Sequence, residues 1–289
     1  GEGPQADGRP ERVARAGAHG EEESCGDGSA HERRGGRTGQ EHTSDRGGVQ
    51  RSARPGAYAA NDEVAGVKFF EPSLDPAEGL GVLLLFRLVE ESVGSFFRPD
   101  RPIHVTRAPG RLDVLGGRAP GPDSLVLQMP IAEGACVALQ ARSDSLVRLW
   151  SPCRDGSRTQ MLSLDLRDLG LPAKPIDAEE ARALFLPGPR DRWAAYLLGA
   201  ALALAQRGLL TEPRGAELLL HSDIPETAGV GASSAITLAA LRAFARLHGI
   251  ELSADEQLAL CLQVEREFVA APSRAVDVGA LLDHLEVPT

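Results

Sequence analysis

The chain has 289 residues and a formal net charge of −10 at pH 7, with 42% hydrophobic and 25% charged residues. These proportions are those of a globular protein that is long enough to bury a core. Aromatic residues make up only 4%, so we expect a core of leucine, valine and alanine. The negative charge argues against nucleic acid or an anionic membrane as the main partner, because neither would meet a basic surface.

Neither a membrane span nor a secretion signal is expected. The apolar run from Leu80 to Phe86 is ended by Arg87 and is far too short to cross a bilayer. The N-terminal region has no apolar segment of the kind that directs secretion. The four cysteines lie far apart without a C-x-x-C pair, which suits a reduced cytoplasmic protein better than a zinc or disulfide scaffold.

The first part of the chain differs in composition from the rest. Residues 1–62 are dense in Gly, Arg, Glu and Ser, and their first 60 positions contain no Leu, Ile, Phe or Trp. Such a segment buries too little apolar surface to offset its ordering entropy, so we expect it to be disordered. Hydrophobic periodicity begins near Val64, and we expect one folded domain over residues 63–289.

The first half of this domain reads as one helix followed by strands. Apolar residues at helical spacing predict a helix through Leu80 that ends near Gly94. A strand begins at Ile103 and is broken by Pro109 and Gly110. Consecutive antiparallel strands are expected next, at residues 124–131, 135–140 and 146–150. The polar stretch up to about residue 190 reads as loop with one short helix.

The second half alternates helices with one strand. A helix carries Trp193 through Leu204, a buried strand contains Leu218–Leu220, and a further helix is expected after the N-cap Ser253. We therefore predict an α+β fold, in which a mixed, mostly antiparallel sheet packs against helices.

A glycine and serine loop, Glu226–Ala235, joins the Leu218–Leu220 strand to a helical pattern that runs from Ile236 to Leu247. Unpaired backbone N–H groups, the positive end of a helix dipole and two hydroxyls would meet there, as in a phosphate site. An ordinary strand-to-helix connection with a serine N-cap has the same pattern, so both interpretations stay open on this stretch alone. A Walker-type P-loop is excluded because its lysine motif is absent.

Three separated blocks together resemble the GHMP kinases, the family of galactokinase, homoserine kinase, mevalonate kinase and phosphomevalonate kinase. The likeness spans roughly residues 68–289 and is greatest to the galactokinase and L-arabinokinase branch. Three blocks in the family's order are far more specific than any one alone. They are residues 107–117 with 124–131, residues 229–235, and residues 261–265 with 271–277.

The resemblance implies the N-terminal, ATP-binding domain of a small-molecule kinase that moves the γ-phosphate of ATP to a sugar hydroxyl, the anomeric one. Ser234 and Glu265 would hold Mg²⁺, Asp277 would accept the proton of the sugar hydroxyl, and Arg111 would keep Asp277 ionised and stabilise developing charge. The ATP phosphates would be held by Gly229, Val230, Gly231, Ala232, Ser233 and Ser234.

Each implied role has a plainer alternative when the residue is taken alone. Arg111 follows Pro-Gly and reads as a surface turn residue. Glu265 lies in a charged segment and reads as a solvated helix face. Asp277 reads as a helix cap before Val278, and Trp193 reads as core.

The chain departs from the family pattern near the sugar. Pro120 and Gly121 stand where the branch carries an Asp-Tyr pair, and neither replaces a carboxylate or phenol hydrogen bond, although Asp123 lies close by. Near Asp277, Arg274 replaces a glycine; such a cation either clamps the phosphate or blocks the site.

The family's C-terminal domain, with its third glycine-rich motif, is absent from the 289 residues. We therefore expect a sugar kinase, a transferase of carbohydrate metabolism, represented by an incomplete N-terminal domain. The alternatives are a catalytically impaired relative that senses ATP or a sugar, and an inactive fragment. The identity of the sugar and the oligomeric state stay open.

Overall fold

A computed structural model describes residues 80–115, 126–153, 158–186, 188–226 and 228–282. These residues form a five-stranded sheet with helices. The expected disorder of residues 1–62 lies outside the described residues. The elements are α1 (Leu80–Ser92), β1 (Ile103–Leu115), β2 (Leu127–Ala141), β3 (Leu146–Trp150), β4 (Met161–Asp165), α2 (Ala178–Phe185), α3 (Arg192–Gln206), β5 (Ala216–Ser222), α4 (Ala232–His248), α5 (Ala254–Gln263) and α6 (Ala275–Leu282).

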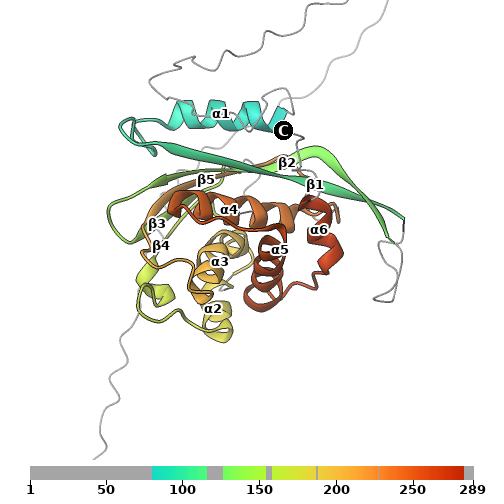
Figure 1. Ribbon diagram of the computed structural model, residues 1–289. Helices are drawn as coiled ribbons and strands as arrows, with labels where there is room; N and C mark the ends of the chain where they lie inside the picture. The colour runs from blue at the N-terminus through green and yellow to red at the C-terminus, as the bar shows by residue number, and fades with distance from the viewer. Residues whose placement is uncertain (1–79, 116–125, 154–157, 187, 227, 283–289) are drawn as a thin grey trace, which may run out of the picture. The chain divides into compact units, whose positions relative to one another are not determined.

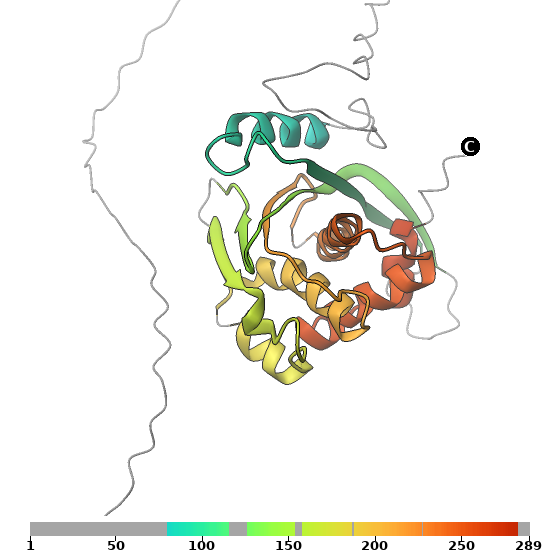
Figure 2. The ribbon, with the colours of Figure 1, turned by 60° about the vertical axis from the view of Figure 1, so that its left-hand side comes forward.

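The sheet separates α1 from the other helices. Figure 1 shows α1 on one face of the sheet and α2 to α6 on the opposite face. Figure 2, which looks nearly along α4, shows the strands curving over this helix. The predicted α+β class with a mostly antiparallel sheet is confirmed.

The strand order is β1-β2-β5-β3-β4, and every neighbouring pair is antiparallel except β3 and β5. The expectation of consecutive antiparallel strands is therefore wrong between β2 and β3, because β5 is inserted between them. This insertion places the end of β5, and the loop that follows it, beside the long β1-β2 ribbon.

Alternate residues of the central strands supply two hydrophobic layers. Leu139, Leu218 and Leu220 belong to the larger core under the helices, while Ala138 and Leu219 pack with α1. Covering both faces explains why Leu218–Leu220 in the middle of β5 form an uninterrupted apolar run. The expected leucine- and alanine-rich core is confirmed, since these two residue types make up most of the larger layer.

Two expected breaks in the strands are wrong. β1 continues through Pro109 and Gly110 to Leu115, with an irregular register between Pro109 and Arg111. β2 is one strand that includes Pro130, which pairs with Arg111 of β1 beyond the last residue paired to β5. Proline is tolerated at such an edge, because the backbone N–H that it lacks is not needed to pair with a second neighbouring strand.

The stretch before α3 holds more structure than the loop and short helix expected there. α2 is that short helix, and Asp177 begins it with a capping box. Strand β4 and the 3₁₀ turn Leu166–Leu169 were not predicted. Further on, Ser253 caps α5 as expected, again with a capping box.

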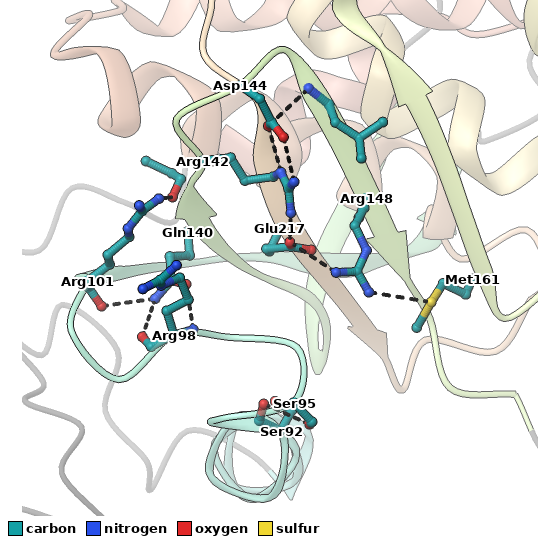
Figure 3. A network of polar contacts seen from close by, with 12 residues as sticks. Ser92, Ser95, Arg98, Arg101, Gln140, Arg142, Asp144, Arg148, Met161 and Glu217 are labelled. Carbon is teal, nitrogen blue, oxygen red and sulfur yellow. Dashed lines mark hydrogen bonds and ion pairs between the residues drawn. The ribbon is translucent and has the colours of Figure 1, made fainter.

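A polar network ties the far end of the sheet together (Figure 3). Glu217 of β5 is only 4% exposed and pairs with Arg142 and with Arg148, whose Nη1 lies 3.3 Å from Oε1. Gln140 donates to the carbonyl oxygens of Arg98 and Arg101 at 2.8 and 3.0 Å. These contacts fix the loop after α1 to β2, away from the glycine and serine loop.

Candidate functional site

The glycine and serine loop ends in an uncapped helix. Gly229 and Gly231 adopt φ values of +75° and +83°, a left-handed conformation that glycine takes at little cost. Gly231 is the N-cap residue of α4, and no side chain caps the helix there. The first-turn amide groups from Ala232 to Ser234 are therefore available to an anion, at the positive end of a 17-residue helix.

This loop is docked on β1. The amide of Arg111 donates to the carbonyl oxygen of Val230 at 2.8 Å. A Cβ on Gly110 would lie 3.0 Å from that oxygen, and a Cβ on Gly231 would lie 2.6 Å from Nη1 of Arg111. Glycine at both positions thus allows the backbones and the arginine to approach closely.

Arg111 is not a surface turn residue, because it lies inside β1 and is 8% exposed. Its Nη2 lies 3.1 Å from Oδ1 of Asp277, and its Nε lies 3.6 Å from Oδ1 of Asp113. The docked loop covers the same guanidinium. Arg111 therefore joins the first sequence block to the third, directly beside the second.

Asp277 lies in the first turn of α6 and is 8% exposed. Burial raises its pKa, but the hydrogen bonds from Arg274 and the charge of Arg111, with a further contribution from Gln128, outweigh burial and hold the pKa below its ordinary value. The Asp277 carboxylate also accepts the backbone amide of Arg274 at 3.3 Å, which is a helix-capping contact. It is ionised at neutral pH.

Gln128 is a site residue to which the sequence assigned no role. Its Nε2 lies 2.6 Å from Oδ1 of Asp113 and 3.2 Å from Oδ1 of Asp277. The side chain lies within the first sequence block, but only the fold of β2 beside β1 and α6 brings it to these carboxylates.

Glu265 is fully buried, while its neighbours Arg266 and Glu267 are exposed. It lies in a π-helical turn, Val264–Phe268, that follows α5, and such turns often occur at functional sites. The turn directs Glu265 inward, so the solvated-face interpretation of this residue is wrong.

The Glu265 carboxylate has no hydrogen-bond partner among the described residues at either oxygen. Burial raises its pKa, whereas the nearby Ser273 and Ser234 hydroxyls and Arg111 act in the opposite direction. An unpartnered buried carboxylate is costly unless a cation neutralises it. Hard oxygen donors of this kind fit Mg²⁺. The described residues contain no cluster of three His, Cys, Asp or Glu side chains that could hold a metal ion.

A pocket of about 640 Å³ contains the loop together with Arg111 and Asp277. Three further arginines line it that sequence reasoning missed, Arg158, Arg190 and Arg192. Arg158 forms an ion pair with Glu226 at the start of the loop. Four arginines against the two carboxylates of Asp277 and Glu226 give the pocket lining an excess of positive charge, which favours a polyphosphate.

Trp193 and Tyr196 add aromatic surface to the pocket wall. Trp193 is also part of the core, as predicted, and its indole N–H donates to the carbonyl oxygen of Thr159 at 3.0 Å. The helical spacing of apolar residues in α3 indicated which face of the helix is buried. It could not indicate that Trp193 and Tyr196 on this helix also border the cavity.

Some residues of the sequence-based site fall outside the described part of the chain. They are Pro120, Gly121 and Asp123. Within the described residues, none of the helices combines the length and apolar character needed to cross a membrane.

The fold and part of the sequence match known proteins. Residues 195–283 match the family model described as the GHMP kinases N terminal domain. Among solved structures, the Lactococcus lactis galactokinase complexed with galactose superposes with a TM-score of 0.55 and 21% identity, covering 69% of this chain and 46% of that one. The Methanococcus jannaschii mevalonate kinase gives a TM-score of 0.50 at 19% identity, covering 62% and 51%.

Sequence relatives point to the same branch of the family. The L-arabinokinase of Arabidopsis thaliana is 34% identical over 210 residues, which are 65% of this chain and 20% of that protein. The galactokinase of Streptomyces coelicolor is 28% identical over 195 residues, covering 66% of this chain and 45% of that enzyme. The chain thus spans between a fifth and less than half of the length of these relatives.

Proposed function

We propose that this chain provides the ATP-binding half of a sugar kinase, which transfers the γ-phosphate of ATP to a sugar hydroxyl, the anomeric one. The observation that carries the proposal is the uncapped start of α4 in the same pocket as the Arg111–Asp277 pair. The galactokinases and the L-arabinokinase among its relatives suggest a sugar as the acceptor.

The loop residues Gly229–Ser234 would donate backbone N–H groups to the phosphates, with the pocket arginines offsetting their charge. Ser234 and Glu265 would hold Mg²⁺, which neutralises phosphate charge when it is bound. Ser234 is 3% exposed and Glu265 is buried, which supports this role because burial restricts the motion of both side chains.

Asp277 would accept the hydroxyl proton as the sugar oxygen bonds to the γ-phosphorus and the bond to the ADP oxygen breaks. The lowered pKa that Arg274 and Arg111 produce keeps the carboxylate in the ionised form that this role requires. Loose transition states of this kind need positioning and charge more than a strong base.

We place the reaction in the cytoplasm, because Cys136 and Cys261 are buried free thiols that suit a reducing compartment.

A second candidate is a relative that binds ATP or a sugar without turnover. The contacts between Arg274 and both oxygens of Asp277 favour it, since the carboxylate is already occupied.

The discriminating experiment is ADP release by the protein with a panel of sugars that includes L-arabinose and galactose. The kinase predicts sugar-dependent release that Asp277→Ala abolishes, while Arg167→Gln, an exposed change outside the pocket, leaves it intact. Tight ATP binding without release under every sugar would overturn the kinase and favour the second candidate.

A further inference from the structure

Five donor contacts converge on the Asp277 carboxylate. Oδ1 accepts hydrogen bonds from Nη2 of Arg274 at 2.7 Å and Nε2 of Gln128 at 3.2 Å, and forms an ion pair with Nη2 of Arg111 at 3.1 Å. Oδ2 receives Nε of Arg274 at 3.0 Å and its backbone amide at 3.3 Å. A carboxylate offers about four lone-pair positions, so this one has no position left for a sugar hydroxyl.

The donors differ in how easily they can leave. The Arg111 side chain is 9% exposed, is held by Asp113 as well, and lies under Gly231. The Arg274 side chain is 38% exposed and, among the described residues, its guanidinium contacts no acceptor except Asp277. Releasing the Arg274 guanidinium would remove one contact from each oxygen at once, and its exposure makes this the least costly release.

We propose that Arg274 blocks Asp277 in the unliganded protein, and that the sugar hydroxyl reaches the carboxylate only after the guanidinium has moved to an oxyanion of the ligand. This inference rests on the proposed kinase function and adds a condition to it. A guanidinium that makes two hydrogen bonds to a carboxylate can leave it for another oxyanion that accepts two hydrogen bonds, which is a phosphate or a second carboxylate.

Two ligands can bring that oxyanion. One is the terminal phosphate of the nucleotide, and the other is an acid group on the acceptor sugar. A neutral sugar alone offers no such partner, so it leaves the Arg274–Asp277 contact in place. Arg274 thus makes access to the base depend on an anion.

The position of Arg274 can be followed directly by NMR. In the full chain with ¹⁵N-labelled arginine, the Nε–H signal that disappears in Arg274→Gln belongs to Arg274. Arg167→Gln is the matched control, because Arg167 makes the same two-point contact with Asp165 outside the pocket. The probes are inorganic tripolyphosphate, a non-hydrolysable ATP analogue with Mg²⁺, galactose and galacturonate.

We expect the Arg274 signal to shift with tripolyphosphate or the ATP analogue if the nucleotide supplies the anion. If the acceptor sugar supplies it, galacturonate should shift the signal. The Arg167 signal and the galactose sample stay unchanged. A signal that none of the anions moves, or that galactose moves equally, would overturn the proposal. Failure of the analogue to bind by calorimetry would count against the kinase function only, because tripolyphosphate still tests the block.

Turnover gives a second, independent readout. Removing the contact from Arg274, whose side chain is 38% exposed and competes with the hydroxyl, should raise kcat/KM for the sugar roughly two- to fivefold in Arg274→Gln. Arg167→Gln should leave kcat/KM unchanged. A fall in kcat for Arg274→Gln would show that Arg274 assists the reaction and would contradict the block.

Discussion

A methyl group at Gly231 tests how tightly the loop is fitted over Arg111. A Cβ there would lie 2.6 Å from Nη1, 3.3 Å from Cγ and 3.6 Å from Cζ of Arg111. Gly229 has nearly the same backbone conformation, with φ +75° against +83°, but a Cβ there would have no atom within 4 Å. The pair Gly231→Ala and Gly229→Ala therefore separates backbone strain from displacement of the arginine.

The expected magnitudes follow from these contacts. Alanine in the left-handed region costs roughly 1–2 kcal/mol, and both variants lose this much. Forcing a methyl group into an occupied space costs roughly 1–3 kcal/mol more, and only Gly231→Ala meets this cost, because the Arg111 side chain is largely buried. We expect unfolding free energies lower by about 1–2 kcal/mol for Gly229→Ala and about 2–5 kcal/mol for Gly231→Ala.

Urea denaturation of the two variants and the parent chain, followed by circular dichroism, measures these free energies. The comparison is valid if the dependence on urea is the same in all three, since a changed slope reports a changed denatured state. Equal losses in the two variants, within about 0.5 kcal/mol, would refute the docking of the loop on Arg111.

Two further predictions concern the buried carboxylates. In the absence of Mg²⁺, Glu265→Gln should raise the unfolding free energy by about 1–2 kcal/mol, because it removes an unpartnered buried charge. Mg²⁺ should stabilise only the parent chain. Calorimetric melting with and without Mg²⁺ measures both effects, and a variant less stable than the parent would contradict the prediction. Asp277 has a lowered pKa, so the stability it contributes is present above its ordinary value of 3.8 and is lost as pH falls through the lowered value. Urea unfolding between pH 5 and pH 2.5 should therefore show a shallower acid decline for Asp277→Asn, and an equally steep decline would sink the idea.

The elements that sequence predicted well are those with local signals. The helix α4 follows from apolar spacing, its start follows from glycines, and Ser253 with Glu256 supplies both halves of a capping box. The loop is the strongest of these signals, because glycine at 229 and 231 serves a conformation that other residues rarely adopt.

The order of the strands could not be predicted, because it depends on contacts between distant segments. β5 lies between β2 and β3 although some 60 residues separate it from β3 in sequence. The continuity of β1 through Gly110 also depends on a distant segment. The amide of Arg111, the residue after Gly110, donates a hydrogen bond to the carbonyl oxygen of Val230.

The site could be predicted only in part, because it too depends on contacts between segments that are distant in sequence. The fold brings Arg111 and Asp277 together, and the motifs indicated this pair, yet nothing local marks Glu265 as buried; only the π-helical turn directs it inward. Arg158 and Arg190 come from segments read as loop, and their shared pocket exists only in three dimensions.

Calorimetric titration of Mg·ATP into the parent chain and into Ser234→Ala tests the central claim most directly. Ser234 is 3% exposed, lies in the first turn of α4 and lines the pocket, so the account predicts a Kd roughly tenfold or more higher in the variant. Ser253→Ala is the control, because that serine caps α5 outside the pocket and its loss should leave the affinity unchanged. An unaltered Kd in Ser234→Ala, or no binding by the parent chain, would contradict the assignment of the loop to the phosphates of ATP.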